Sequence, residues 1–554
     1  MQLDTARIGL APPPWRKWRA FFGRSRLTTA TFTDVMADVY EDRTAFLLDK
    51  PLESSFFSGH VVSYRDLQRL TARAAGMLQD LGVRRGDRVA LCTLNRIELV
   101  FVELGALRIG AIPVPLNFML TASEIEQLVA QSGARVMVTD RTVFEQNIGD
   151  PARVPSIETW VLVTQRAVPP GAQSFAALME AASESTPPAD VADDEPAIIF
   201  FTAGTTGLPK GAVLTAGGLM YGFRTYAKLA AVLPTPSRRL ALQVMPLAHT
   251  GGHQALLTLM ALATPTIVMG RFDPALVLDA IERHRVSVFA GIPAMYRMLL
   301  DAGAERRDLS SVRVWGGGGD AFPRDLIERF RALAERRLGP LRLRPLFVIG
   351  YGMAETSGQV SLTPPYAAGD SCIGWFLPGV RFRVVDAEGH DVDDGEPGEL
   401  LLRSPGMMRG YWNDPAASDA ALRDGWLRTG DVVRVGPWGI KYFVAREKEM
   451  IKVGGYSVFP AEIEHVLDRH PAVRSSVVVG VAHPIKGEIP IAAVVLRPGE
   501  TISKEELLAW ARERIAPYRC PRGVEFLPSI PHGFAMKPLR RLVRERLAEM
   551  GASS

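Results

Sequence analysis

The spacing of apolar residues first predicts a helix between Ser63 and Gly82. Apolar side chains fall three or four positions apart along this segment, so they share one face of a helix. Ser63, with Asp66 three residues later, is typical of a helix start, and Gly82 is typical of a helix end. The apolar face consists of Leu67, Leu70, Ala74, Leu78 and Leu81.

Four short apolar runs then predict strands that are buried on both faces. Helical patterns or turns separate the runs, which is the order expected of a parallel sheet covered by helices. We therefore expect an α/β domain over roughly the first 440 residues. The four runs cover residues 88–94, 135–139, 160–163 and 197–201.

The pattern changes in the charged segment 444–451, where we place the boundary of a smaller domain. Pro460 suits the first turn of a helix that reaches about Arg469, and Ser503 with Glu506 forms the capping box of another. Strands are expected at 475–481, 490–496 and 524–527, which together give a compact α+β domain. The expected organisation is an N-terminal extension over residues 1–30, an α/β domain over 31–445 and a C-terminal domain over 446–554.

The composition is that of an ordinary folded protein of 554 residues, with 47% hydrophobic and 22% charged residues. The net charge of +4 is small and dispersed, so nucleic acid is not expected as a partner. Three distant cysteines fit neither a disulfide framework nor a short-spaced metal site, and no export signal is recognisable, which favours a cytoplasmic location. The apolar stretch 253–270 is too short for a membrane helix and contains Pro265, so we expect it in the core.

Residues 12–27 have an amphipathic pattern. Trp15, Trp18 and Phe22 lie at helical spacing among basic residues, a pattern shared by helices that contact a membrane surface and by helices that dock on their own protein. Peripheral membrane contact is therefore one of two interpretations of this segment.

A loop suited to phosphate follows the run 197–201. It has the sequence TAGTTGLPKG over residues 202–211, so hydroxyls and glycines precede Lys210. Glycines let backbone N–H groups turn toward an anion, hydroxyls donate hydrogen bonds or help to hold Mg²⁺, and the lysine adds positive charge. The loop is not a Walker A loop, because Pro209 and Gly211 stand where that pattern requires Gly and Ser or Thr.

Further motifs follow along the chain. They are MPLAH at 245–249, WGGGGD at 315–320, YGMAET at 351–356, GEL at 398–400, GYW at 410–412 and GWLRTGD at 425–431. Together with the loop at 202–211, they resemble the motifs of the adenylate-forming superfamily of acyl-CoA synthetases, aryl-CoA ligases, carrier-loading adenylation domains and beetle luciferases. The resemblance runs from about Thr31 to Leu547, and it implies a large α/β N-terminal domain with a small, mobile α+β C-terminal domain.

The resemblance assigns most motif residues to nucleotide binding. Tyr351 would contact adenine, Glu355 and Thr206 would hold Mg²⁺, and Asp431 would bind both ribose hydroxyls, since one carboxylate accepts two hydrogen bonds. Arg446 would also reach the ribose. The full set implied for the cofactors is Thr202, Gly204, Thr205, Thr206, Gly207, Lys210, Gly317, Gly318, Asp320, Tyr351, Gly352, Met353, Glu355, Thr356, Asp431, Arg446, Lys448, Lys452, Gly454 and Gly455.

The implied reaction has two steps. A carboxylate attacks the α-phosphorus of ATP, pyrophosphate leaves, and the acyl group then moves from the adenylate to a thiol. Because two anions must meet, charge stabilisation and positioning matter most, and the implied catalytic residues are Lys537, Thr206, Glu355 and Lys210. The resemblance implies ATP, Mg²⁺ and coenzyme A as cofactors, and a rotation of the C-terminal domain about Lys448 between the two steps.

Several positions depart from the family pattern. Ala203 and Ala354 each replace a hydroxyl, and Ala535 and Met536 precede Lys537 where the family often has Ser-Gly. A lost hydrogen bond to phosphate costs roughly 1.5 to 3 kcal/mol unless another group, such as Thr202 or Thr356, compensates. A binding homologue without turnover is therefore an alternative, which the retention of the charged motif residues Lys210, Glu355, Asp431, Arg446 and Lys537 disfavours.

The resemblance also places an acyl pocket around His249. The residues after it provide no carboxylate for a substrate ammonium, so an amino acid is disfavoured, and the small apolar surroundings favour a fatty or aryl acid. Coenzyme A is the expected acceptor, and a phosphopantetheinyl carrier protein is the alternative because it presents the same thiol. The oligomeric state stays open. The expected pocket residues are His249, Gly251, Gly252, Ile292 and Gly316.

Overall fold

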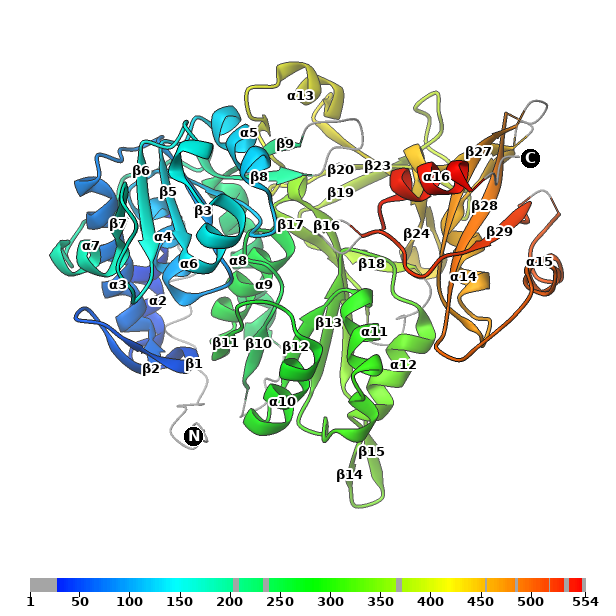
Figure 1. The fold of residues 1–554 in the computed structure, drawn as a ribbon, viewed down its shortest axis with the longest axis horizontal. Coiled ribbons are helices and arrows are strands. Elements are labelled where there is room, and N and C mark those ends of the chain that lie inside the picture. The colour runs from blue at the N-terminus through cyan, green and yellow to red at the C-terminus, as the bar shows by residue number, and fades with distance from the viewer. Residues whose placement is uncertain are drawn as a thin grey trace. The chain divides into compact units, whose positions relative to one another are not determined.

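A computed structural model describes residues 27–202, 209–232, 239–364, 371–453, 456–483, 487–517, 519–532 and 538–550. The chain divides into two compact units, both built from helices and strands (Figure 1). The large unit contains Met1–Ala368, Gly374–Arg381 and Arg403–Gly425. The small unit contains Gly369–Ile373, Phe382–Leu402 and Trp426–Ser554.

The first sheet of the large unit is parallel, with the strand order β4-β3-β5-β6-β7. All residues of β4 and β5 are buried, which explains why the sequence reads as unbroken apolar runs. The buried parallel strands predicted near residues 88–94, 135–139 and 160–163 are confirmed. The bounds are β3 (Arg88–Cys92), β4 (Ile112–Pro115), β5 (Val136–Asp140), β6 (Thr159–Val163) and β7 (Ala172–Ser174), with α4 (Ile97–Arg108) and α5 (Ala122–Ser132) between strands.

The run 197–201 forms a strand with different partners from those predicted. β8 (Pro196–Thr202) pairs antiparallel with β9 (Lys210–Thr215), and β21 (Gly410–Tyr411) completes a three-stranded sheet. The expectation of a parallel strand here was wrong. A strand buried on both faces loses its polar alternation whatever the direction of its partner, so the apolar run does not reveal antiparallel pairing.

The second sheet of the large unit has the order β17-β16-β13-β12-β10-β11-β1-β2. The strands from β16 to β1 in this order are parallel to one another, and helices connect successive strands, so their carboxyl ends meet along one edge. The strands are β1 (Thr44–Glu53), β2 (Ser58–Ser63), β10 (Ala241–Gln243), β11 (Thr266–Val268), β12 (Val288–Gly291), β13 (Val314–Gly318), β16 (Leu346–Met353) and β17 (Gly358–Leu362). The helices are α8 (Ala216–Val232), α9 (Thr250–Ala261), α10 (Pro274–His284), α11 (Pro293–Asp301) and α12 (Arg324–Leu333).

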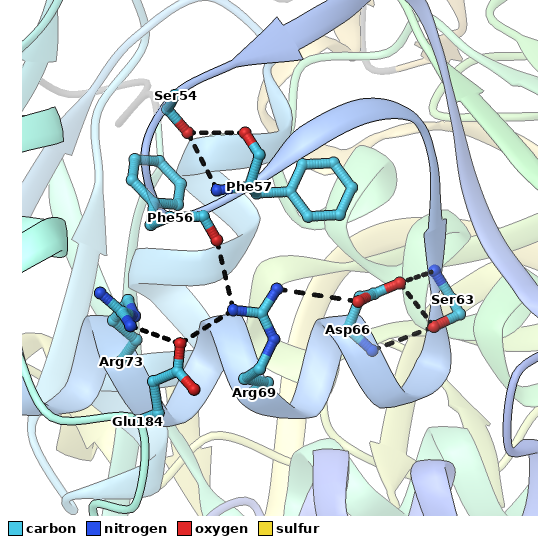
Figure 2. A network of polar contacts seen from close by, with 8 residues as sticks. All are labelled: Ser54, Phe56, Phe57, Ser63, Asp66, Arg69, Arg73 and Glu184. Atoms are coloured by element: carbon cyan, nitrogen blue, oxygen red, sulfur yellow. Dashed lines mark hydrogen bonds and ion pairs between the residues drawn. The ribbon is translucent and has the colours of Figure 1, made fainter.

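Helix α3 (Tyr64–Asp80) begins after the predicted N-cap Ser63, which forms a capping box with Asp66. Ser63 Oγ accepts from Asp66 N at 3.0 Å, and Asp66 Oδ2 accepts from Ser63 N at 3.1 Å. Further along the helix, Arg69 donates to Phe56 O at 3.2 Å and to Glu184 Oε1 at 3.0 Å (Figure 2). These contacts tie α3 to the β1–β2 hairpin and to the chain that follows α7 (Phe175–Ala181).

The small unit contains two sheets, ordered β19-β20-β23-β24 and β26-β25-β28-β27, with β29 beside β28. Helices α14 and α15 contribute to the core on one face of the second sheet, and α16 contributes to the core on the other face. The strands are β19 (Arg381–Val385), β20 (Gly398–Arg403), β23 (Trp426–Val435), β24 (Lys441–Arg446), β25 (Ile451–Val453), β26 (Tyr456–Val458), β27 (Val473–His483), β28 (Gly487–Leu496) and β29 (Gly523–Phe526). The helices are α14 (Pro460–Leu467), α15 (Lys504–Arg512) and α16 (Arg540–Glu549).

The elements predicted for the small unit are confirmed. Pro460 occupies the first turn of α14, which ends at Leu467, slightly before the expected Arg469. At the start of α15, Ser503 Oγ accepts from Glu506 N at 3.2 Å and Glu506 Oε2 accepts from Ser503 N at 2.9 Å. The three predicted strands correspond to β27, β28 and β29.

The apolar stretch 253–270 supplies most of α9 and all of β11, and most of its residues are buried, as predicted. No helix in the described part of the chain combines the length and the apolarity needed to cross a bilayer. The amphipathic residues 12–27 fall almost entirely outside the described residues, so the two interpretations of that segment remain predictions.

Candidate active site

Predicted site residues gather along the carboxyl edge of the second sheet in the large unit. His249 follows β10, Ile292 directly follows β12, Asp320 follows β13, and Glu355 follows β16. These strands are parallel neighbours, so the residues after their carboxyl ends come to one edge although they are far apart in sequence. Ligands of open α/β sheets bind at such an edge.

The glycine strip forms the end of β13. Gly316, Gly317 and Gly318 pair with Val348, Ile349 and Gly350 of the parallel strand β16, and all three remain partly exposed. Ile292 lies beside the end of the strip, because a Cβ placed on Gly319 would be 3.4 Å from Ile292 Cγ2. The strip therefore gives the sheet edge a surface without side chains.

Gly318 and Gly352 must be glycines because a neighbouring backbone oxygen lies where a Cβ would stand. A Cβ on Gly318 would lie 2.6 Å from Gly350 O, and a Cβ on Gly352 would lie 2.0 Å from Gly358 O. Both distances are shorter than any ordinary contact, and the obstructing atoms belong to the backbone, which cannot rotate away. Any side chain here would push β13, β16 and β17 apart.

A group of three polar residues connects the phosphate loop with the motif after β16. Glu355 lies in the 3₁₀ turn η5 (Ala354–Thr356), and its Oε1 accepts from Tyr411 Oη at 2.8 Å. The Nζ atom of Lys210 lies 5.3 Å from the centroid of the Tyr411 ring, a cation–π distance. The pairing of β21 with β9 places Tyr411 opposite Ala212, so the backbone fixes this arrangement.

Tyr411 is a candidate site residue that sequence reasoning missed. The motif at 410–412 was counted among the family motifs without a binding role, and its contact with Glu355 joins positions 56 residues apart. The available signal was the aromatic phenol itself, which can bind a carboxylate with its hydroxyl and a cation with its ring. Nothing in the spacing of the motifs pointed to a partner.

The hydroxyls of Thr202 and Thr356, which could compensate for Ala203 and Ala354, form hydrogen bonds with backbone groups of their own segments. Thr202 Oγ1 donates to Lys210 O at 3.3 Å across the β8–β9 hairpin. Thr356 is buried, and its Oγ1 lies 2.7 Å from Gly358 O and accepts from Met353 N at 3.1 Å. Both residues therefore stabilise the backbone of the motifs in which they lie.

Several predicted residues fall outside the described part of the chain. They are Ala203, Gly204, Thr205, Thr206 and Gly207 of the phosphate loop, Gly454 and Gly455 of the small unit, and Ala535, Met536 and Lys537 near the chain end. The described ends of the phosphate loop, Thr202 and Lys210, face each other as a register pair, so the loop closes a hairpin.

The predicted acyl-pocket residues on α9 lie in its first turn. His249 is the N-cap, and its Nδ1 accepts from Gly251 N at 3.2 Å, so the neutral imidazole carries its proton on Nε2. Gly252 packs so tightly that a Cβ would lie 2.1 Å from Pro246 O, whereas a Cβ on Gly251 would have His249 Nδ1 at 3.6 Å. Gly251 is therefore the roomier of the two positions.

In the small unit, Asp431 and Arg446 form a pair across β23 and β24. Arg446 Nε lies 2.8 Å from Asp431 Oδ1, and the side chain of Asp431 is 1% exposed. Arg446 also donates to Thr429 O at 3.2 Å. The contact places a cation beside the buried carboxylate that is predicted to bind the ribose, which offsets part of the cost of burying its charge.

The turn that contains the predicted hinge contacts the start of α16 within the small unit. Lys448 is exposed in the turn η7 (Glu447–Glu449), and the next residue, Glu449, accepts from Arg540 Nε at 2.9 Å. Arg540 opens α16 and follows Lys537 by three positions. Lys452 is exposed on β25, where its backbone N–H donates to a carboxylate oxygen of Glu488 at 3.2 Å.

Comparison with known families gives two matches along the chain. Residues 34–412 match the family described as AMP-binding enzyme, and residues 462–533 match the AMP-binding enzyme C-terminal domain. The first match alone spans more than half of the chain.

Curated relatives cover almost the whole protein. The feruloyl-CoA synthase of Amycolatopsis sp is 35% identical over 501 residues, 88% of this chain and 94% of that protein. The long-chain-fatty-acid-CoA ligase of Yersinia pestis is 30% identical and covers 94% of this chain and 95% of that protein. The fatty acid-[acyl-carrier-protein] ligase ScoC of Streptomyces coeruleorubidus is 31% identical and covers 88% and 92%.

Solved structures of similar proteins have the same fold. ATP-bound MatB from Rhodopseudomonas palustris superimposes with a TM-score of 0.81 at 26% identity, covering 95% of this chain and 100% of that chain. The o-succinylbenzoate CoA synthetase of Bacillus subtilis, in complex with its acyl-adenylate intermediate, gives a TM-score of 0.77 at 26% identity and covers 94% and 98%.

Backbone crowding at Gly318, and the wider space at Gly251, predict different effects on stability when each glycine is replaced by alanine. Gly318→Ala should lower the free energy of unfolding by about 1 to 3 kcal/mol, because its Cβ would meet the backbone oxygen of Gly350. Gly251→Ala serves as the control and should leave stability unchanged or slightly raised, since it adds a helix-favouring residue in open space. Urea unfolding followed by circular dichroism measures both, and equal losses would contradict the close-approach argument.

The Tyr411 contact predicts a binding defect without a folding defect. Tyr411→Phe keeps the ring beside Lys210 but removes the donor to Glu355, so the affinity for ATP with Mg²⁺ should fall about tenfold. Tyr442→Phe is the matched control, because the Tyr442 hydroxyl donates no hydrogen bond within the described residues. Calorimetric titration with ATP and Mg²⁺ compares them, and unchanged affinity in Tyr411→Phe would refute this placement of Glu355.

Proposed function

Because this chain belongs to the family of AMP-binding enzymes, we propose that it activates an aryl or fatty acid with ATP as an acyl-adenylate and converts it to the coenzyme A thioester. The observation that carries this proposal is the alignment with feruloyl-CoA synthase, which extends over 94% of that protein. The similarity to a long-chain-fatty-acid-CoA ligase supports the same reaction with a different class of acid. The products would be the acyl-CoA, AMP and pyrophosphate.

In the first step, a carboxylate oxygen of the acid attacks the α-phosphorus of ATP. An O–P bond forms, the bond to the bridging oxygen breaks, and its electron pair leaves on pyrophosphate. Lys210 begins β9 directly after the phosphate loop and is held beside the Tyr411 ring, so we assign it to the phosphate charge. Thr206, Glu355 and Lys537 complete the proposed catalytic group, and the Thr205 hydroxyl is assigned to the bound nucleotide.

Mg²⁺ fits the carboxylate of Glu355. One oxygen accepts from Tyr411, while Oε2 has no hydrogen-bond partner among the described residues, and hard oxygen ligands suit this ion. We propose that Glu355 and Thr206 hold the ion, which would neutralise phosphate charge when bound. The contribution of the chain itself is to fix the Glu355 carboxylate at the carboxyl edge of β16.

The small unit supplies the proposed ribose contacts. Asp431 is buried and paired with Arg446, so its orientation is fixed, and an ionised carboxylate accepts hydrogen bonds from both ribose hydroxyls. The remaining nucleotide contacts are assigned to Gly317, Gly318, Asp320, Tyr351, Gly352, Met353 and Thr356, and the acyl pocket to His249, Gly251, Gly252, Ile292 and Gly316.

In the second step, the thiol sulfur attacks the acyl carbon, an S–C bond forms, and AMP leaves while the thiol proton passes to water. We propose that the domain from residue 446 onward turns about Lys448 and replaces Lys537 with Lys452, Gly454 and Gly455. The contact between Arg540 and Glu449 supports this, because it joins the segment after Lys537 to the residue after the hinge.

The acceptor is proposed to be coenzyme A, with a phosphopantetheinyl carrier protein as the second candidate. The similarity to ScoC, whose name specifies an acyl carrier protein, favours keeping this alternative. We also propose a cytoplasmic location, which fits three free and buried cysteines and the supply of ATP and coenzyme A.

Pyrophosphate release across fatty, aryl and dicarboxylic acids tests the proposal, each acid being assayed with and without coenzyme A. We expect acid-dependent release over many turnovers with coenzyme A and about one equivalent without it. Release limited to one equivalent in both conditions would favour a carrier protein, and no release with any acid would favour a binding homologue.

Lys537→Ala separates catalysis from binding. The variant should lose acid-dependent pyrophosphate release by at least about a hundredfold, because no cation would bridge carboxylate and phosphate, while its affinity for ATP should stay within about twofold. Lys504→Ala is the control, since Lys504 pairs with Glu525 on the surface of the small unit. Equal activity of Lys537→Ala and the control would remove Lys537 from the catalytic group.

A further inference from the structure

Two glutamines near Gly358 are not used by the reaction proposed above. Gln359 follows the first residue of β17, and Gln254 lies in the second turn of α9, close after the predicted pocket residues Gly251 and Gly252. Both residues lie close to Gly358. Gln359 is the next residue in the chain, and a Cβ added to Gly358 would lie 2.9 Å from Gln254 Cγ. The two amides therefore flank the same short segment of backbone.

A buried tyrosine fixes the direction of the Gln359 amide. Tyr226 of α8 is 5% exposed, and its hydroxyl donates to Gln359 Oε1 at 2.7 Å. Burial raises the pKa of Tyr226 well above its usual value, so the phenol remains protonated and acts as the donor. Because Tyr226 occupies the amide oxygen, the NH₂ group must point to the other side.

The other side of the Gln359 amide is the glycine strip. A Cβ on Gly350 would lie 1.8 Å from Gln359 Nε2, and a Cβ on Gly318 would lie 4.0 Å from the same atom. The NH₂ group therefore covers the ends of β13 and β16, and within the described residues it has no hydrogen-bond acceptor. The NH₂ group of the half-buried Gln359 is thus a hydrogen-bond donor beside the glycine strip.

Gln254 supplies a second amide, which lies between Gly358 and Gly222 of α8. The residue is 2% exposed, and neither its Nε2 nor its Oε1 has a hydrogen-bond partner among the described residues. Its amide lies against α8, since a Cβ on Gly222 would be 2.6 Å from Nε2, and Gly222 is one helical turn before Tyr226. Leaving a buried amide unsatisfied is costly, which is the pattern of a group kept for a ligand.

We propose that Gln359 and Gln254 recognise a hydroxyl group on the acyl part of the substrate, so that this chain prefers a hydroxylated acid to its hydrocarbon analogue. A hydroxyl both donates and accepts, and so can satisfy an amide NH₂ group and an amide oxygen together. The inference rests on the proposed function, because it concerns the acid that is activated. Tyr226 is a positioning residue, which acts by holding the amide of Gln359.

Matched pairs of acids test this recognition. Octanoic and 8-hydroxyoctanoic acids form one pair, and cinnamic and 4-hydroxycinnamic acids form the other, each assayed for thioester formation with ATP and coenzyme A. We expect at least one hydroxylated acid to exceed its partner in kcat/KM by about tenfold or more. If thioesters form and neither pair shows a preference, the inference is overturned while the ligase function stands.

Variants of the cluster separate recognition from stability. Tyr226→Phe frees the Gln359 amide and should reduce the preference about tenfold, while kcat/KM for the hydrocarbon acid stays within about twofold. Tyr40→Phe is the matched control, because it removes an equally buried phenol bond, from Tyr40 Oη to Ala261 O at 2.7 Å, at the far end of α9. It should lower the Tm without changing the preference, and an equal loss of preference in both variants would overturn the inference.

Gln254→Leu provides a second, independent readout. If Gln254 is kept for a substrate hydroxyl, the variant should lose preference for the hydroxylated acid and yet have a raised Tm in the free protein. A lowered Tm with unchanged preference would assign Gln254 a purely structural part and overturn its inclusion. If no acid forms a thioester, the proposed function fails, and calorimetric titration with the four acids decides the inference: stronger binding of a hydroxylated acid supports it, and equal or absent binding overturns it.

Discussion

The close approach of backbones at the ends of β13, β16 and β17 is the constraint on which the candidate site depends. Gly318 meets the carbonyl of Gly350, and Gly352 meets the carbonyl of Gly358, at separations that leave no room for a Cβ. This packing requires glycines at the carboxyl edge of the sheet, where Gly316, Gly317 and Gly318 remain partly exposed. We propose that this surface receives the planar base and the acyl group, while the loops around it supply the charged residues.

Charge is the second constraint, because adenylation joins two anions. In the described residues, hydrogen bonds, a ring contact and an ion pair fix the positions of the cations and carboxylates that we assign to the site. Lys210 Nζ lies 5.3 Å from the centroid of the Tyr411 ring, and the Tyr411 hydroxyl donates to one oxygen of Glu355, so the residues that we propose for phosphate and Mg²⁺ share one aromatic partner. In the small unit, the Arg446 guanidinium lies 2.8 Å from the buried Asp431 carboxylate and fixes its orientation. Preorganised groups of this kind stabilise developing charge without reorganising during the reaction.

Local signals predicted much of the fold, and long-range pairing accounts for what they missed. The capping boxes at Ser63 and Ser503 depend on residues three positions apart, so the sequence is sufficient to find them. The direction of β8 depends on a hairpin partner beyond the phosphate loop, and a fully buried apolar run is the same for either direction. Tyr411 was missed because its partner Glu355 is distant in sequence, and spacing carries no information about such contacts.

The most direct test of the account is acid-dependent exchange of radiolabelled pyrophosphate into ATP without coenzyme A. Reversible adenylation at the carboxyl edge of the sheet predicts exchange with any acid that the protein activates, and AMP in amounts equal to thioester once coenzyme A is added. Formation of ADP and phosphate, or absence of exchange with an acid that the protein binds, would contradict the account.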